Sequence, residues 1–252
     1  MASTSPAEEW TRLAIAKFRF DLESTCRRSV LVAYVAEQAL RWPSTRFVAS
    51  VVRPLSLLAS RIESWQDENV KKQVLFIQGG GTGVHDEWDN KLVDSLRQEL
   101  GPNYDVRYPR MPKEADPSYT MWKAALAEEI DGLDDGAILI GHSLGGTILI
   151  NALAETPPNR KFAGIFLIAA PFLGPGGWPS EDIKPTANLG ARLPQRTPIY
   201  LYHGSEDDTA PFAHVDLYGR AIPGAIVHRL CRRNHQLNYD LAEVAAGVRV
   251  LT

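Results

Sequence analysis

From residue 72 onward, short apolar runs alternate with segments of helical periodicity, and this alternation restricts the fold more than any other feature. The runs cover six stretches, residues 74–77, 104–108, 137–140, 162–170, 198–202 and 225–230. They are apolar or β-branched at nearly every position, which is typical of strands covered on both faces. The pattern therefore predicts an α/β fold, a three-layer α/β/α sandwich around a mostly parallel six-stranded sheet.

The first 70 residues do not follow this alternation. Their sequence predicts three helices, over about residues 6–23, 29–42 and 46–66. We therefore expect the chain to have two parts, a helical N-terminal extension over residues 1–70 and an α/β domain over residues 71–252.

Composition argues against several classes of protein. The 252 residues carry 27 Lys and Arg against 30 Asp and Glu, a net charge of −3, which does not favour a nucleic-acid partner. Two cysteines, Cys26 and Cys231, are too few for a disulfide scaffold and indicate reduced thiols in the cytoplasm. No apolar run is long enough for a membrane span, and the first residues lack the pattern of a secretory signal. A cytoplasmic location is therefore expected.

Residues 141–145 read Gly-His-Ser-Leu-Gly and match the pattern G-x-S-x-G. In that pattern a serine occupies a sharp, strained turn from a strand into a helix, and small flanking residues avoid collisions with neighbouring backbone. The required context is present, because an apolar run over residues 137–140 precedes the motif and a helical segment over residues 147–154 follows it. Ser143 is therefore the candidate nucleophile, and the alternative is an inert serine in a glycine-rich turn.

A serine hydroxyl needs a base that removes its proton and an acid that orients the base. In this arrangement the two follow the serine in the order Asp or Glu, then His. Asp207 follows the apolar run over residues 198–202, where the acid is expected, and Asp208 and Glu206 are the alternatives. His235 lies beyond the last apolar run and is the candidate general base.

Acyl transfer also needs N–H donors that stabilise the oxyanion. One is expected from Leu144, the residue after the serine, and another from the glycine-rich loop after the first apolar run. Gly80 is the candidate in that loop, and Gly81 is the alternative. Glycine-rich loops also bind phosphates, but neither G-x-G-x-x-G nor a G-K-[ST] ending is present, so the oxyanion role is favoured.

The other histidines near these segments are expected to be structural. We predict that His142 packs beneath the turn, that His203 and His228 lie in or at the ends of strands, and that His214 is exposed on a helix. No two histidines have the spacing of a metal site, so neither a metal nor a cofactor is predicted.

The chain resembles the α/β-hydrolase superfamily in four segments and in their order: residues 78–81, 141–145, 204–207 and 234–235. The likeness covers about residues 72–252, and within the superfamily the chain looks most like the small, lidless serine hydrolases related to retinoblastoma-binding protein nine. It departs in lacking the usual first strands and in having Gln78 and Gly79 where His-Gly is usual. Residues 175–197 form too short a connection for a cap domain, so an open pocket is expected unless the N-terminal helices cover it.

The resemblance implies a carboxylesterase-type serine hydrolase that acts on a small-molecule ester or amide through an acyl-enzyme. Ser143 would be the nucleophile, His235 the general base and Asp207 the orienting carboxylate. The N–H groups of Leu144 and Gly80 would hold the oxyanion. The same triad would serve an acyltransferase or a perhydrolase, which is the first alternative. A non-catalytic binding module that engages a partner through the N-terminal helices is the second.

Overall fold

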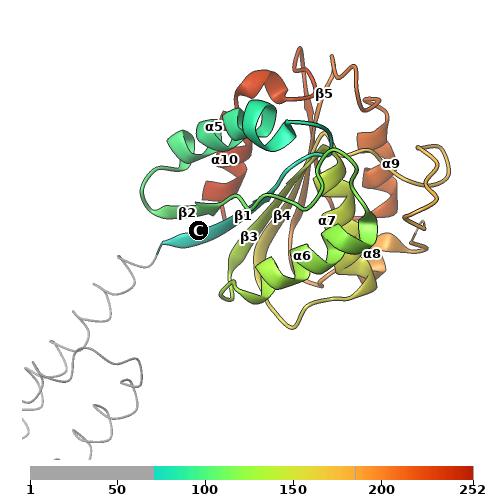
Figure 1. Ribbon diagram of the computed structural model, residues 1–252, viewed down its shortest axis with the longest axis horizontal. Helices are drawn as coiled ribbons and strands as arrows, with labels where there is room; N and C mark the ends of the chain where they lie inside the picture. Colours follow the sequence, from blue (N-terminus) through green and yellow to red (C-terminus); the bar gives the residue numbers. More distant parts are fainter. Residues whose placement is uncertain (1–70, 185, 252) are drawn as a thin grey trace, which may run out of the picture. The chain divides into compact units, whose positions relative to one another are not determined.

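A computed structural model describes residues 71–184 and 186–251. The helices predicted over residues 6–66 lie outside these described residues. Within the described residues, a six-stranded sheet lies between two layers of helices (Figure 1). The predicted three-layer α/β/α architecture is therefore confirmed.

The sheet is parallel throughout. Its strands are β1 (Lys72–Ile77), β2 (Tyr104–Arg107), β3 (Ala137–His142), β4 (Phe162–Ile168), β5 (Ile199–Gly204) and β6 (Ile226–Leu230), in the spatial order β2-β1-β3-β4-β5-β6. Every neighbouring pair is hydrogen-bonded in parallel register. The strands coincide with the predicted apolar runs, because a parallel strand that helices cover on both faces must be apolar along its length.

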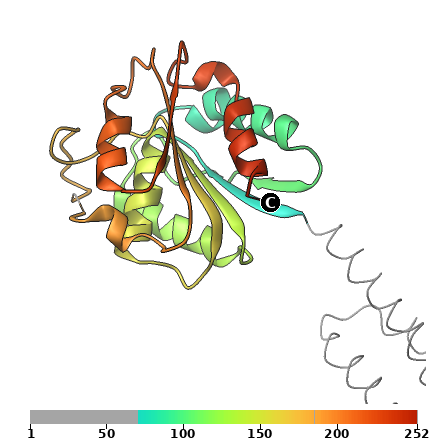
Figure 2. The ribbon, with the colours of Figure 1, turned by 180° about the vertical axis from the view of Figure 1, so that it is seen from behind.

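Helices cover both faces of the sheet. They are the π-helix η2 (Val84–Asp89), α5 (Asn90–Leu100), α6 (Tyr119–Asp131), α7 (Ser143–Glu155), α8 (Leu189–Arg192), α9 (His214–Ala221), the 3-10 helix η3 (Leu237–Tyr239) and α10 (Ala242–Arg249). In Figures 1 and 2, α5 and α10 lie on one face of the sheet and α6, α7, α8 and α9 on the other. Two apolar clusters, one for each face, divide the core in the same way. Across the described ranges, no helix has the length and apolar character needed to cross a membrane.

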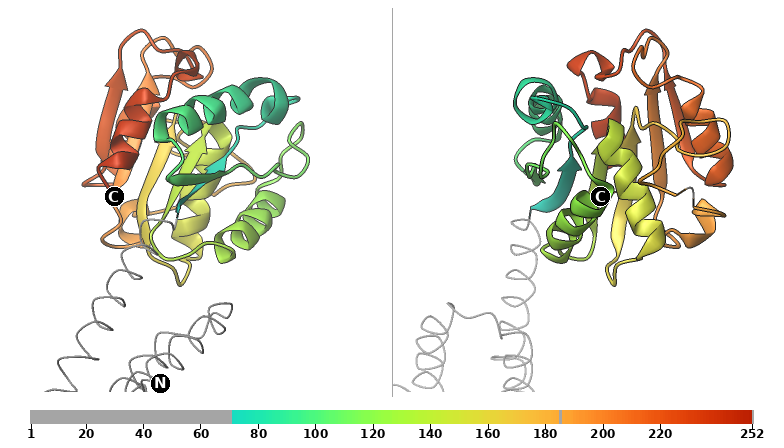
Figure 3. Two further views of the ribbon diagram at one scale, coloured as in Figure 1. Left: turned by 90° about the vertical axis from the view of Figure 1, so that its left-hand side faces the viewer. Right: turned by 45° about the vertical axis from the view of Figure 1, so that its right-hand side comes forward.

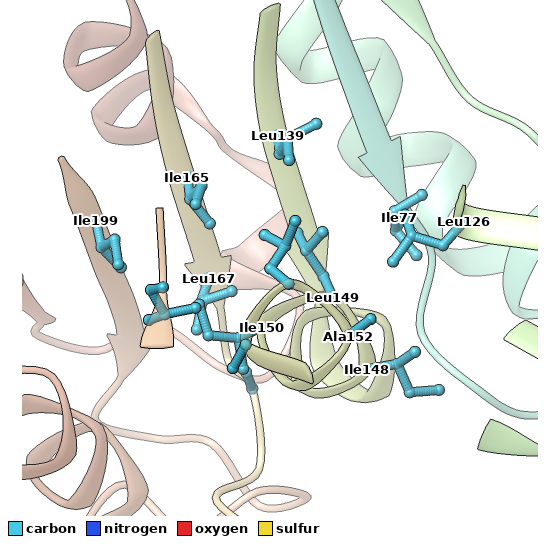
Figure 4. Packing of buried hydrophobic residues seen from close by; sticks show 14 of the residues in the cluster. Ile77, Leu126, Leu139, Ile148, Leu149, Ile150, Ala152, Ile165, Leu167 and Ile199 are labelled. Carbon is cyan, nitrogen blue, oxygen red and sulfur yellow. The ribbon is translucent and has the colours of Figure 1, made fainter. Parts of the chain in front are cut away.

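The helix that follows the predicted nucleophile is the most deeply buried helix of its layer. Every residue of α7 from Gly145 to Ala154 is buried. Its apolar side chains, among them Leu149, belong to one cluster with Leu139 of β3 and Ile165 of β4 (Figure 4). A helix that is apolar on all sides must be covered on all sides, and α6 and α8 both contact α7. The start of α7 is therefore a rigid point on which a reactive side chain can be held.

The carboxyl ends of the parallel strands meet along one edge of the sheet, where β3 passes directly into α7 and the loops after β1, β5 and β6 begin. These loops and the start of α7 carry all the predicted site residues. Figure 3 shows from two further sides how the twisted sheet runs between its helical layers. In the described part of the connection between β4 and β5, only the short α8 is helical.

Candidate active site

Ser143 lies where β3 passes directly into α7. Its φ is 49°, in the left-handed region that residues other than glycine rarely adopt. The turn is closely packed, because a Cβ at Gly145 would collide with the carbonyl oxygen of Gln78, and a Cβ at Gly141 would lie 2.5 Å from Gly146 Cα. The chain therefore has the strained strand-to-helix turn that the G-x-S-x-G pattern requires.

His235 lies in the loop after β6 and faces Ser143. Its Nε2 lies 2.9 Å from Ser143 Oγ, and its Nδ1 lies 2.9 Å from Asp207 Oδ2 and 3.0 Å from Asp207 Oδ1. Because a carboxylate only accepts hydrogen bonds, Nδ1 carries the proton, and Nε2 is left to accept the hydroxyl proton of Ser143. The structure thus brings the three predicted residues together in one continuous hydrogen-bonded chain.

The Asp207 side chain is fully buried and well supplied with donors. Its Oδ1 accepts hydrogen bonds from the backbone N–H groups of Thr209 and Ala210, at 2.9 and 2.8 Å, and its Oδ2 lies 3.0 Å from His203 Nε2. Burial by itself would raise the pKa of Asp207, but the hydrogen bonds from His203 and His235 outweigh burial and hold that pKa well below its usual range. Asp207 is therefore ionised.

The two alternative acids lie elsewhere on the same loop. Glu206 and Asp208 are both exposed, and Asp208 accepts a hydrogen bond from the adjacent Thr209 hydroxyl at 3.3 Å. Among these three acids, all of which lie in the described part of the chain, only Asp207 contacts His235.

The environment of His235 favours its neutral form. Burial is the main influence and lowers the pKa of His235 below the ordinary value for imidazole. The hydrogen bond to Asp207 acts in the opposite direction, and the nearby His142 ring adds to the lowering. A neutral imidazole near neutral pH is the form that a general base requires.

Close backbone contact joins the loops that carry Asp207 and His235. Gly204 ends β5, and a Cβ there would collide with the carbonyl oxygen of Arg233, two residues before His235. The N–H of Glu206 donates to the same carbonyl oxygen at 2.9 Å. The spacing between acid and base is therefore set by backbone contacts that leave no room for a side chain at residue 204.

The glycine-rich loop after β1 lies against the start of α7. The N–H of Gly79 donates to Asp89 Oδ2 at 2.7 Å, and that of Gly81 donates to a backbone carbonyl oxygen at 2.6 Å. The N–H of Gly80 makes no hydrogen bond to the described residues, and a Cβ on Gly80 would lie 2.6 Å from Leu144 Cδ2. The geometry thus favours Gly80 over Gly81 as the free donor beside Leu144.

The sequence profile described as "Alpha/beta hydrolase family" matches residues 74–250. The chain belongs to this family. The match starts in β1 and ends just beyond α10, so it includes every element that carries the candidate triad. Among curated proteins, no sequence matches the chain.

Solved alpha/beta hydrolase-like structures resemble the chain in fold at low sequence identity. A mutant of the meta-cleavage product hydrolase CumD is 17% identical, with 72% of this chain and 92% of that chain covered and a TM-score of 0.56. Est1E from Butyrivibrio proteoclasticus with ferulic acid bound is 16% identical, with 72% and 88% covered and a TM-score of 0.52. A bromoperoxidase from Bacillus anthracis is 15% identical, with 73% and 92% covered and a TM-score of 0.54.

Three residues join this alpha/beta hydrolase site without having been predicted for it. His203, expected to be a structural residue of a strand, is buried in β5 and reaches Asp207, and His142 and Asp89 form a buried pair beside the serine. His203 and Asp207 lie at a strand end and in a turn rather than on a helix, so their spacing of four residues gave no signal in the sequence. The prediction that His214 is exposed is wrong: it is buried, and its Nδ1 accepts the N–H of Phe172 at 3.0 Å.

A cavity of about 310 Å³ lies beside α7, α8 and α9. It is lined by Asn151, Phe172, Leu173, Pro175, Thr186, Ala187, Leu189 and Tyr218. Neither the triad nor the glycine-rich loop contributes to its lining. Residues 71–184 and 186–251 contain no group of three or more side chains that could hold a metal ion.

Replacing Gly80 by Ala in this alpha/beta hydrolase is expected to lower kcat by about 10- to 100-fold. The added Cβ requires Leu144 or the loop to move, and a displacement of about 1 Å at a catalytic group can cost 10²-fold. Steady-state kinetics on an activated ester would measure the effect. Gly219→Ala is the matched control, because its Cβ would meet Val227 at an ordinary 3.4 Å. Equal kcat in the two variants would contradict the role of Gly80.

Proposed function

We propose that this chain is a serine hydrolase of the carboxylesterase type. It cleaves a carboxylic ester of a small molecule, or the corresponding amide, through an acyl-enzyme. One observation carries the proposal: His235 links the Ser143 hydroxyl, at 2.9 Å, to the buried carboxylate of Asp207, at 2.9 Å. Such a chain of contacts converts a weak hydroxyl nucleophile into a reactive one.

In the first half of the reaction, Ser143 Oγ attacks the carbonyl carbon while His235 Nε2 takes the hydroxyl proton. The imidazolium that forms is stabilised by the ionised Asp207. The negative charge on the carbonyl oxygen is held by the N–H groups of Leu144 and Gly80. Leu144 is the second residue of α7, where a backbone N–H has no partner within the helix. His235 then gives its proton to the leaving alcohol, and the acyl group stays on Ser143.

In the second half, a water molecule replaces the alcohol. His235 takes a proton from water, the resulting hydroxide attacks the acyl carbon, and the proton returns to Ser143 Oγ as the acid leaves. In these steps the proton moves only between Ser143, His235, the substrate and water.

Labelling with a fluorophosphonate probe tests the proposal. The wild-type protein is expected to form one covalent adduct, located at Ser143 by peptide mass spectrometry, because the probe reacts with activated serines. The Ser143→Ala variant should not label, and the control Ser180→Ala should label like wild type, since Ser180 lies in the β4–β5 connection and only accepts the N–H of Ile183. A wild-type protein that fails to label, or a Ser143→Ala protein that labels equally, would rule out the proposed nucleophile.

Acyl transfer to an acceptor other than water is the other use of the same triad. Product analysis with an alcohol, an amine or hydrogen peroxide competing against water separates the two uses. We expect the free acid as the main product. A predominant ester, amide or peracid would instead identify an acyltransferase or a perhydrolase. A panel of esters of graded acyl length then defines the substrate.

A further inference from the structure

A second buried pair of an acid and a histidine lies directly beside the candidate triad. Asp89 is the last residue of η2, and His142 is the last residue of β3 and the immediate neighbour of Ser143. Asp89 Oδ2 lies 2.9 Å from His142 Nδ1, and the exposed fractions of the two side chains are 1% and 2%. Burying two ionisable groups is costly unless they are paired and hydrogen-bonded, so this pair needs a physical explanation.

The pair connects three parts of the site. Asp89 Oδ2 also accepts the N–H of Gly79, at 2.7 Å, in the loop that carries Gly80. On the other side, His142 Nε2 donates to the backbone carbonyl oxygen of His235, at 3.1 Å. The glycine-rich loop, the turn at the nucleophile and the loop of the base are therefore tied to one buried centre.

The hydrogen bonds of His142 indicate that its ring is an imidazolium. Nδ1 faces a carboxyl oxygen of Asp89 and Nε2 faces a backbone carbonyl oxygen. A carboxylate and a carbonyl oxygen only accept hydrogen bonds, so both ring nitrogens are protonated unless Asp89 itself carries the proton. Burial lowers the pKa of His142, but the charge and hydrogen bond of Asp89 outweigh burial and raise it overall. The competing arrangement is a neutral pair with the proton on Asp89.

The charge on His142 acts on His235 at short range. The two ring centroids are 4.9 Å apart, within the distance at which a like charge disfavours protonation. The other titratable groups around the pair come from three places: Tyr108 after β2, Asp207 after β5, which is paired with His203, and Tyr239 in η3. Burial raises the pKa of both tyrosines, so they stay neutral and leave His142 as the cation that faces the base.

We propose that His142, held by Asp89, is a positioning residue that carries a positive charge during catalysis. It fixes the main chain of His235, and its charge adds to burial in keeping the His235 ring in the neutral form that accepts a proton. This role rests on the proposed function of the triad. The consequence is an enzyme that stays active at lower pH than an isolated imidazole base would allow.

The protonation state is tested on the wild-type protein by NMR of the histidine ring nitrogens. At pH 7, His142 is expected to show two nitrogens of similar shift, as in an imidazolium, and His235 two widely separated shifts, as in a neutral ring. The His142→Asn and His235→Asn variants assign the signals. A neutral His142 at pH 7 would overturn the proposal, and this measurement requires no substrate.

The effect on catalysis is tested with Asp89→Asn, which removes the negative charge that holds the second proton on His142. Both hydrogen bonds of Asp89 end on Oδ2, so an amide oxygen in that place still accepts the N–H of Gly79 and the Nδ1–H of His142. A neutral His142 ring then has no proton on Nε2 for the carbonyl oxygen of His235, and that bond is lost. The acid limb of the curve of kcat/KM against pH reports the pKa of the base in the free enzyme. In Asp89→Asn this limb is expected to move to higher pH, by up to about one unit. His142→Asn should move it further, by about one to two units.

The control for both variants is His228→Asn. His228 stacks on Tyr202, with ring centroids 4.4 Å apart, and does not contact the triad. The acid limb of the kcat/KM curve of His228→Asn should therefore match that of wild type. An unmoved acid limb in a folded Asp89→Asn protein overturns the proposal. A wild-type protein with no Ser143-dependent activity overturns the proposed function instead. In that case, NMR titration of His235 in the same variants measures directly whether the charge of His142 changes the pKa of His235.

Discussion

Replacing His235 by Ala is expected to lower kcat/KM by about four to six orders of magnitude, the largest loss we predict for any single substitution with an intact fold. The structure gives Ser143 Oγ one base, at 2.9 Å, and an unassisted hydroxyl is a poor nucleophile. Adding Ser143→Ala to His235→Ala should cost little more, because nucleophile and base act as one unit.

The measurement is a double-mutant comparison of kcat/KM on one activated ester. Circular dichroism and thermal unfolding confirm that each variant is folded, which matters because His235 is buried. The control is His228→Asn, whose activity should equal that of wild type. The proposed mechanism does not allow Ser143 and His235 to act independently. They would do so if the fold-loss of kcat/KM in the double variant equalled the product of the fold-losses in the two single variants.

Replacing Asp207 by Asn is expected to lower kcat by about 10⁴-fold while leaving KM nearly unchanged. The reason is the tautomer of His235. An amide NH₂ facing Nδ1 favours the ring that carries its proton on Nε2, and that ring has no lone pair for the hydroxyl of Ser143. The Asn side chain also lacks the charge that stabilises the imidazolium in the transition state.

The chain provides a matched control for this substitution in the next residue. Asp208 is exposed and contacts the hydroxyl of Thr209 rather than His235, so Asp208→Asn removes the same charge from the same loop without touching the base. Its kcat should stay within about twofold of wild type, as for most surface substitutions. If Asp207→Asn were as active as Asp208→Asn, the orienting acid would have to lie elsewhere.

Much of the fold was predictable because burial on both faces makes parallel strands continuously apolar. The six runs from residue 74 onward therefore match the six strands, with boundaries that differ by at most two residues. The start of α7 was placed at residue 147, whereas the helix begins at Ser143. The small residues of the motif carry no apolar periodicity, so the first turn of this helix is invisible to the hydrophobic pattern.

The helix after β1 begins irregularly. Residues 84–89 form the π-helix η2, and the regular helix α5 begins only at Asn90. Sequence periodicity predicts that a helix is present but does not reveal an inserted wide turn. That turn has a local consequence, because Asp89, at its end, is the residue that reaches His142.

The candidate site was partly predictable for a different reason. Ser143, Asp207 and His235 follow strand ends in a fixed order, so each could be proposed from its place in the chain. His203 and the Asp89–His142 pair lack such a position. Asp89 and His142 are 53 residues apart, and a contact between distant residues on different elements leaves no periodic trace in one sequence.

The position of the base also determines when this chain becomes reactive during synthesis. His235 follows Ser143 by 92 residues and lies beyond β6, the edge strand that pairs only with β5. At about 5–20 residues per second, a ribosome needs roughly 5–18 s to extend the chain from one residue to the other. A nascent domain that ends at β5 holds Ser143 without His235. In the proposed mechanism such a chain has no base for the serine, and the complete triad forms only after β6 and the following loop have joined the sheet.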